Sequence, residues 1–353
     1  MLNLVDILTY AVHNRASDIH IVPGHVPILG IDKRWKEAEG FKVVRPEDSQ
    51  RLTKEMVGEK RFARLIELRD LDFSTYVEGL CRFRVNAHFQ RNSIGIAFRV
   101  ISDEVPKFAT LNLPAVIQNF VKLPRGLVLI TGPTGSGKST TLASLIDMIN
   151  QSTSKHIITL EDPVEYMISS QKSLIEQREV GADVPNFASG LKHALRQAPD
   201  IILVGEIRDL ETTSAAITAA ETGHLVLSTL HTQNAHQTIE RIVDIYPGEQ
   251  QHYILGMLSN TLQAVVTQTL LNRADQEGMV PACEVMLCNP AVRNCIRENR
   301  IHEIPNIIET SRSQGMCLLD DSLKRLLLNG MITQEQAIEQ ANRPDVLNKA
   351  LVA

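Results

Sequence analysis

The hydrophobic and polar positions of this chain change their spacing once, near residue 105. Before that point, apolar residues recur first with the period of an amphipathic helix and later at every second position, as in a half-buried strand. The helical spacing covers residues 4–12 and 46–68, and the alternation covers residues 18–22, 71–76, 81–90 and 95–100. The pattern predicts an α+β domain over residues 1–105, with helices packed on a meandering antiparallel sheet.

From Leu127 onward, short and continuous apolar runs alternate with helical segments. The runs LVLIT, HIITL, IILVG and HLVLST are typical of parallel strands that are buried on both faces. Three prolines between residues 106 and 124 separate this region from the first. We therefore predict a hinge or linker over residues 106–120 and an α/β domain over residues 121–353, which becomes mostly helical after about residue 250.

The composition limits the classes of function. The 353 residues are 43% hydrophobic and 22% charged, which is enough for two packed cores. The formal charge of -5 gives no overall positive field to attract nucleic acid, so we expect no nucleic-acid partner. The N-terminus has no basic lead, and no apolar run approaches the roughly 18 residues that span a bilayer. We expect a cytoplasmic protein that reaches a membrane only through partners.

The five cysteines give no sign of a metal site or a disulfide framework. Their number is odd, and no two of them form the CxxC pair that is common in zinc sites. We interpret Cys81, Cys283, Cys288, Cys295 and Cys317 as reduced thiols that lie mostly in the core.

A complete phosphate-binding loop follows the run LVLIT. The sequence GPTGSGKS matches the pattern G-x-x-x-x-G-K-[ST] and opens the helical segment STTLASLIDMI. In this motif backbone N–H groups surround the phosphates of ATP, Lys138 reaches the β and γ phosphates, and Ser139 binds Mg²⁺. The predicted nucleotide-binding residues are Gly132, Pro133, Thr134, Gly135, Ser136, Gly137, Lys138, Ser139 and Thr140.

Two acidic strand ends are candidates for the chemistry at the γ phosphate. Glu206 follows the run IILVG, and because Gly205 stands where an aspartate is usual, Glu206 is the predicted metal-side carboxylate for Mg²⁺. Glu161 and Glu165 flank a proline that ends the run HIITL, and one of them should polarise the attacking water. We favour Glu165, with Glu161 as the alternative, since sequence does not measure hydrogen-bond reach.

Two histidines bracket the strand LVLST. His224 precedes the strand, and His231 ends it, at the kind of strand end where parallel sheets bind ligands. We interpret the two together as candidates for a sensor of the γ phosphate and His236 as an ordinary surface or core residue.

Arg82 and Arg84 alternate on a predicted strand of the first domain, so both side chains point to the same face. They are candidate arginine fingers, which neutralise the charge that develops on the γ phosphate when supplied across a subunit or domain boundary. The candidates closer in sequence to the P-loop region are Arg125 and Arg208, and an ordinary exposed strand face is the competing interpretation of Arg82 and Arg84.

The ordered motifs GPTGSGKST, EDPVEY, ILVGEIRD and TGHLVLSTLHT resemble the Walker A, Asp box, Walker B and His box of the secretion ATPase superfamily. Within it, AVRNCIRE at 291–298 resembles the AIRNLIRE motif of the type IV pilus retraction ATPases, the PilT group, and GMCLLDDSL at 315–323 resembles the segment that follows. The departures are Val292, Cys295 and the segment at 31–35, which leave an auxiliary paralogue open.

The resemblance implies a PAS-like N-terminal domain and a RecA-like P-loop NTPase domain. It implies a homo-hexamer in which each N-terminal domain packs on a neighbour and brings Arg82 and Arg84 to a shared nucleotide. The implied activity is hydrolysis of ATP with Mg²⁺ to drive pilus retraction by pilin depolymerisation, and hence twitching motility. The implied partners are the inner-membrane platform protein at the pilus base and a retraction paralogue, with the motor peripheral to that membrane.

Three alternatives remain from the residues alone. One is another motor of the superfamily, for pilus extension or type IV secretion, although the chain lacks the tetracysteine insert usual in extension and type II secretion ATPases. The second is a nucleotide-gated ring member that hydrolyses ATP poorly, which the intact Lys138, Glu165 and Glu206 disfavour. The third is a small-molecule kinase, for which the sequence shows no lid or acceptor-pocket pattern.

Overall fold

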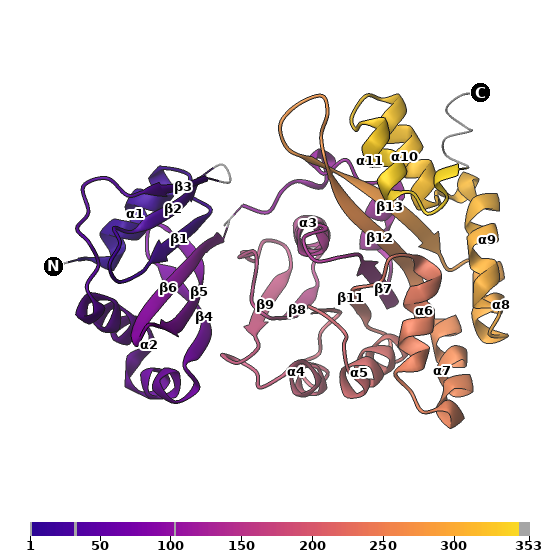
Figure 1. Cartoon of the computed structure of the whole chain (residues 1–353). Coiled ribbons are helices and arrows are strands. Elements are labelled where there is room, and N and C mark those ends of the chain that lie inside the picture. The colour runs from indigo at the N-terminus through magenta and orange to yellow at the C-terminus, as the bar shows by residue number, and fades with distance from the viewer. Residues whose placement is uncertain (1, 32–33, 102–103, 346–353) are drawn as a thin grey trace. The chain divides into compact units, whose positions relative to one another are not determined.

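The computed structural model describes three stretches of the chain, residues 2–31, 34–101 and 104–345. The chain divides into two compact units (Figure 1). The first unit comprises the residues up to Glu104 together with Glu165–Met167. The second unit comprises Val105–Val164 and the chain from Ile168 onward.

In the described part of the first unit, six strands form one antiparallel sheet in the order β3-β2-β1-β6-β5-β4. The helices α1 and α2 contribute Ile7, Leu8, Leu52 and Leu65 to the same core as Phe83. The predicted α+β class of this region is confirmed. The bounds are α1 Leu4–His13, β1 Asp18–Ile21, β2 Ile28–Ile31, β3 Arg34–Glu37, α2 Pro46–Leu68, β4 Asp70–Val77, β5 Cys81–Gln90 and β6 Ser93–Ile101.

The first unit also differs from the sequence prediction. Strands β2 and β3 were not predicted. The side chains of β3 are exposed at all its positions, and those of β2 do not alternate in burial, so neither strand gives the pattern of a half-buried strand. Helix α2 is interrupted at Gly58, whose φ of 72° is not helical. The departure from the family pattern at 31–35 includes Asp32 and Lys33, which lie outside the described residues.

In the described part of the second unit, seven strands form a sheet in the order β13-β12-β7-β11-β10-β8-β9. All neighbouring strands run parallel except β12 and β13, which form an antiparallel pair. This arrangement confirms the predicted α/β class. The strands are β7 Gly126–Thr131, β8 His156–Glu161, β9 Leu174–Glu179, β10 Ile201–Val204, β11 Leu225–Leu230, β12 Leu262–Asn272 and β13 Met279–Leu287.

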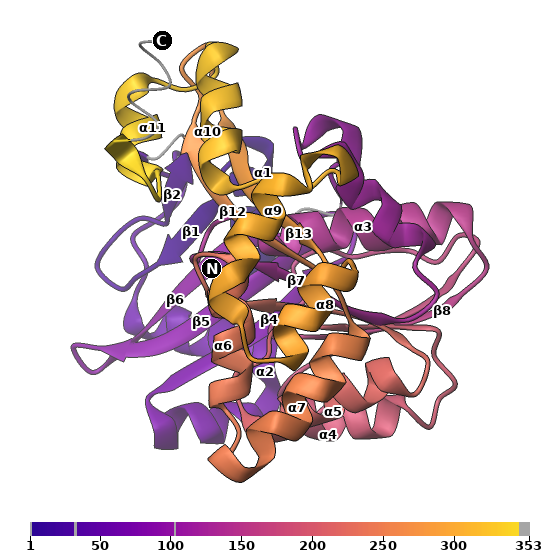
Figure 2. The same cartoon turned by 90° about the vertical axis from the view of Figure 1, so that its right-hand side faces the viewer.

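Helices cover both faces of this sheet, which explains why its central strands are continuously apolar. Along β7, Leu127 and Leu129 pack with α4 to α9, whereas Val128 and Ile130 pack with α3. Figure 2 shows α3 on one side of the strands and α4, α5 and α7 on the other. The helices are α3 Lys138–Ser152, α4 Phe187–Ala194, α5 Leu210–Glu221, α6 Ala235–Asp244, α7 Gly248–Thr261, α8 Pro290–Arg297, α9 Ile304–Thr310, α10 Leu319–Leu328 and α11 Gln334–Gln340.

One expectation about the second region is incomplete, and another needs correction. The chain after residue 250 contains the helices α7 to α11, but it also contains β12 and β13, which form a long hairpin that packs against α10 and α11. Residues 106–120 do not form a free connection, because Phe108 and Ile117 are buried in the core with α3. Two 3₁₀ helices, Phe108–Thr110 and Ala115–Lys122, carry these apolar side chains. The prolines mark the turns of a packed segment.

The cysteines behave as expected. Cys81, Cys283, Cys288 and Cys295 are buried, Cys317 is half-buried, and all five are free thiols. Burial raises the pKa of the Cys317 thiol to about 11. Within the residues that the structure describes, no helix has both the length and the apolar composition needed to cross a membrane.

Candidate active site

The P-loop joins the end of β7 to the start of α3. Gly132, Gly135 and Gly137 have φ angles of 137°, 77° and 85°, in the region that favours glycine. A Cβ at Gly132 would overlap the carbonyl oxygen of Gln268 on β12. Gly132 and Gly137 are therefore required both by the backbone conformation and by the close approach of β12, and Gly135 by the backbone conformation alone.

The side chains of the loop are set to receive an anion. The Lys138 Nζ donates to the carbonyl oxygens of Gly132 and Pro133 at 2.8 and 2.9 Å. The Ser136 hydroxyl is buried without a hydrogen-bond partner among the described residues, and Ser139 is exposed at the start of α3. Burial lowers the pKa of the Lys138 ammonium, and the negative charge of Glu206 opposes that shift. These are the donor types that bind phosphate oxygens.

Glu206 lies at the carboxyl edge of the sheet, where the parallel strands end, as the P-loop does. It follows β10, and its Oε2 accepts a hydrogen bond from Arg208 Nε at 2.7 Å and lies 3.4 Å from His231 Nε2. Its side chain is only 18% exposed. A Cβ at Gly205 would lie 3.2 Å from the carbonyl oxygen of Leu160, so this close packing explains a glycine where an aspartate was expected. The structure therefore brings together Glu206, His231 and Arg208.

His224 lies at the amino edge of the sheet, where the parallel strands begin. It directly precedes β11, and its carbonyl oxygen accepts a hydrogen bond from Gly126 at the start of β7, whereas the P-loop follows the end of β7. Its Nδ1 lies 3.0 Å from the carbonyl oxygen of Ala219. Strand β11 separates His224 from His231 by on the order of 20 Å. The structure thus does not bring the two histidines together.

The acidic segment after β8 contains two differently placed glutamates. The Oε1 of Glu161 accepts hydrogen bonds from Thr159 Oγ1 at 2.6 Å and from Gln177 Nε2 at 3.1 Å. Glu165 belongs to the first unit, in the segment Glu165–Met167. Sequence reasoning missed Glu179, which is 5% exposed and accepts a hydrogen bond from the N–H of Val164 at 3.3 Å. Glu179 therefore helps to fix the turn between Glu161 and Glu165.

The arginine candidates differ in exposure and contacts. On β5, Arg84 is exposed and Arg82 is half-buried, while Phe83 between them is buried, as the alternation predicted. The Arg82 Nη2 donates to Ser74 Oγ on β4 at 2.6 Å. In the second unit, Arg125 directly precedes β7 and so lies at the edge opposite the P-loop. Arg208 is 70% exposed and pairs with Glu206, so it remains a candidate arginine finger.

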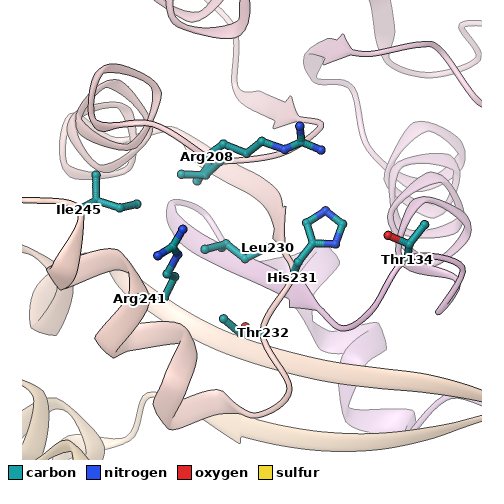
Figure 3. Close-up of a pocket in the computed structure, with 8 residues that line it drawn as sticks. Thr134, Arg208, Leu230, His231, Thr232, Arg241 and Ile245 are labelled. Atoms are coloured by element: carbon teal, nitrogen blue, oxygen red, sulfur yellow. The ribbon is translucent and has the colours of Figure 1, made fainter.

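A cavity of about 620 Å³ adjoins the P-loop within the second unit. Thr134 of the loop and His231 both line it, together with Arg208 and with Arg241 of α6 (Figure 3). Figure 3 shows Arg208 and His231 on the side of Thr134, with Arg241 beside Leu230. Sequence reasoning missed Arg241, since nothing in the α6 pattern distinguishes it from other surface arginines. The arginines give the cavity a positive lining that suits a phosphate-bearing ligand.

Comparisons with known proteins agree with the fold and the motifs. A family model described as type II/IV secretion system protein matches residues 109–308. The type IV pilus retractation ATPase PilT of Pseudomonas aeruginosa is 42% identical over 98% of this chain and 99% of its own length. The type IV pilus ATPase PilU of the same species is 36% identical over 95% of this chain and 88% of its own length.

A solved structure extends the likeness to three dimensions. The crystal structure of the pilus retraction motor PilT with bound ADP is 43% identical, covers 99% of this chain and 100% of its own chain, and superposes with a TM-score of 0.93. This likeness supports nucleotide binding, and it confirms an N-terminal domain followed by a RecA-like domain. The resemblance seen in the motifs is also confirmed, and the chain belongs to the type II/IV secretion system protein family.

Proposed function

We propose that this protein is an ATP-hydrolysing motor that retracts type IV pili by pilin depolymerisation and so drives twitching motility. The observation that carries the proposal is the 42% identity to a pilus retraction ATPase, which extends over 98% of this chain and 99% of that relative. The complete P-loop, with Glu206 and His231 at the same sheet edge, supplies the parts that ATP hydrolysis requires.

Binding of ATP uses the donors of the P-loop. The Lys138 ammonium exchanges its two loop carbonyls for the β and γ phosphates, which are stronger acceptors because they are charged. Ser139 and Glu206 are the residues that would hold Mg²⁺, with a hydroxyl and a carboxylate as oxygen ligands. When bound, Mg²⁺ neutralises part of the charge that develops on the transferred phosphoryl group.

The attacking water needs a carboxylate base, and we assign this role to Glu165. The alternative, Glu161, already accepts hydrogen bonds from Thr159 and Gln177. Hydrogen bonds to the ionised form make a carboxylate a weaker base. Their presence favours Glu165.

His231 acts as the sensor of the γ phosphate in this proposal. Its ring lines the cavity beside Thr134 and lies 3.4 Å from the Glu206 carboxylate, so it can respond to charge at both. His224 has no part in the site of its own subunit, because it lies at the other end of β11.

Arg82 and Arg84 are the proposed arginine fingers, each supplied by one subunit to the nucleotide of a neighbour in a homo-hexamer. Arg84 is exposed and ready to reach a partner, whereas Arg82 is held by Ser74 and would have to exchange that bond. In this arrangement the motor is cytoplasmic and works at the inner-membrane base of the pilus, against the platform protein.

The test is complementation of a deletion strain with the wild-type chain or with Glu206→Ala, measuring pilus retraction and ATP hydrolysis. Restored retraction and hydrolysis with wild type alone is the expected result. Hydrolysis by the purified wild-type chain without restored retraction would contradict the proposal. It would favour a second candidate, an accessory pilus ATPase, for which the 36% identity to PilU over 95% of the chain is the supporting observation.

A further inference from the structure

Gln268 lies directly behind the P-loop. Strand β12 pairs in parallel with β7 up to Thr267 beside Thr131, so the next residue of β12 reaches the point where the loop begins. Gln268 is 2% exposed, and no feature of its sequence context distinguishes it. Its position follows only from the way in which β12 joins the sheet.

The side-chain amide of Gln268 connects the loop to helix α3. Its Nε2 donates to the carbonyl oxygen of Ser136 at 2.6 Å, and its Oε1 accepts from Thr141 Oγ1 at 3.0 Å. A carbonyl can only accept, so the contact with Ser136 fixes which end of the amide faces the loop. Both polar ends of a buried side chain are therefore satisfied by the loop and its helix.

Both ends of the loop also close on Gln268 by packing. A Cβ at Gly132 would overlap its carbonyl oxygen, and a Cβ at Gly137 would lie 3.1 Å from its Nε2. Such a distance is tighter than most real Cβ contacts. The first and last glycines of the loop are thus fitted to this residue of β12.

The bond to Ser136 sets the direction of a neighbouring donor. In a trans peptide unit, the carbonyl and the following N–H point in opposite directions. Because Gln268 holds the Ser136 carbonyl toward β12, the N–H of Gly137 points away from β12. In a P-loop the inner N–H groups are those that bind phosphate oxygens.

We propose that Gln268 is a positioning residue for nucleotide binding, which fixes the Ser136–Gly137 peptide so that its N–H is aimed at the phosphates. The inference rests on the proposed ATPase function and adds a residue to it. Gln268 touches no phosphate itself and acts through the loop. It also connects the β12–β13 hairpin to the nucleotide, because Gln268 pairs with Cys283 of β13.

The test compares Gln268→Glu, Gln268→Leu and a matched control, Thr267→Val, in the full-length chain. Thr267 is the preceding residue of the same strand and is 4% exposed. Its Oγ1 lies 2.7 Å from the Oγ1 of Thr131, which belongs to β7 and not to the loop. Titration with ADP and Mg²⁺ gives the Kd, steady-state kinetics with ATP give KM and kcat, and thermal unfolding gives Tm.

We expect Gln268→Glu to raise the Kd for ADP about tenfold or more, because an ionised carboxylate cannot donate to Ser136 and repels its carbonyl. Gln268→Leu should raise it by about tenfold, which corresponds to 1.4 kcal/mol. Thr267→Val should lower Tm with a Kd within about twofold of wild type, since its lost hydroxyl braces the strand and not the loop.

A second variant keeps the test decisive if the Gln268 variants do not fold. Thr141→Val removes the donor to Oε1 and should raise the Kd by about threefold, a smaller effect because the Ser136 bond remains. In a double-mutant cycle, adding Thr141→Val to Gln268→Leu should cause little further loss.

Two results separate the possible failures. If wild type binds ADP, but the Gln268 and Thr141 variants keep its Kd within twofold and only lower Tm, Gln268 is a packing residue and the inference is wrong. If wild type itself binds no ADP, the proposed function fails before the role of Gln268 arises.

Discussion

The carboxyl edge and the amino edge of the sheet in the second unit carry similar residues, but these residues make different contacts. His224 and His231 flank the same strand, yet of the two only His231 lies near Glu206, the proposed metal-side carboxylate, at 3.4 Å. The His224 ring instead lies 3.0 Å from the carbonyl oxygen of Ala219 in α5. Lys138 donates a hydrogen bond to a carbonyl oxygen of the P-loop, whereas Lys155 forms an ion pair with Asp200 at 2.9 Å beside the start of β8.

The difference indicates that strand direction, more than residue type, decides which side chains lie near the proposed site. Parallel strands present their carboxyl ends together, and helices that follow them begin at that edge with free N–H groups. At the amino edge, His224 instead contacts Ala219 of α5, and Lys155 pairs with Asp200. These two side chains therefore contact the fold and not the P-loop.

The largest expected effect distinguishes the two glutamates of the segment after β8. Glu165→Gln should lower kcat by about 10²- to 10⁴-fold and leave the Kd for ADP unchanged, because it removes the proposed general base. Glu161→Gln should lower kcat less, since that carboxylate is engaged by Thr159 and Gln177. Steady-state hydrolysis and ADP titration measure both, and normal turnover in Glu165→Gln would move the base to Glu161.

The next effect compares the two lysines. Lys138→Ala should weaken ADP binding on the order of 100-fold, because it removes charged hydrogen bonds to phosphate. Lys155→Ala, at the amino edge, should bind ADP like wild type. Calorimetric titration measures both, and equal losses would show that the loss reflects general destabilisation.

A smaller effect is expected from the two histidines. His231→Asn should lower kcat about tenfold, because the ring lies beside Glu206 and Thr134 in the cavity. His224→Asn should keep kcat within about twofold and lower Tm, since the ring contacts Ala219 and Thr222 and not the P-loop. A larger kcat loss in His224→Asn than in His231→Asn would reverse the assignment of the two edges.

The smallest effect concerns stability at the amino edge. Burial alone would raise the pKa of Asp200. Hydrogen bonds from the N–H of His156 and from Lys155 together have the larger effect and hold the pKa below its usual value. The stabilisation is therefore fully present above the usual aspartate pKa and is lost as pH falls through the lowered one, below about pH 4.

Asp200→Asn should accordingly lower the free energy of unfolding by about 1 kcal/mol at neutral pH, because the ion pair is half-exposed. The difference from wild type should shrink in acid. Denaturant unfolding at pH 7 and pH 3 measures it, and a constant difference at both values would contradict the assigned cause.

The sequence predicted the parts of the fold that have strong local signals. Strands β7, β8, β10 and β11 were found because helices cover both faces and leave continuous apolar runs. Strand β9 was missed because it is an edge strand with charged residues, and β12 because its side chains do not alternate and helices surround it along the chain. The order of the strands depends on contacts distant in sequence.

The candidate site shows the same limit. Lys138 and Glu206 follow buried strands, so their edge of the sheet could be predicted from the chain direction alone. The error at His224 came from treating two residues that bracket one strand as one group, although the strand holds them apart. Gln268 and Arg241 gave no local signal, because each reaches the loop or the cavity from an element far along the chain.

The most direct test of the account is ATP hydrolysis, with no added phosphoryl acceptor, by purified wild type, Glu206→Ala and Lys155→Ala. We predict phosphate release by wild type and by Lys155→Ala, and loss of turnover with retained ADP binding in Glu206→Ala. Equal rates in wild type and Glu206→Ala would contradict the claim that the carboxyl edge of this sheet performs the chemistry.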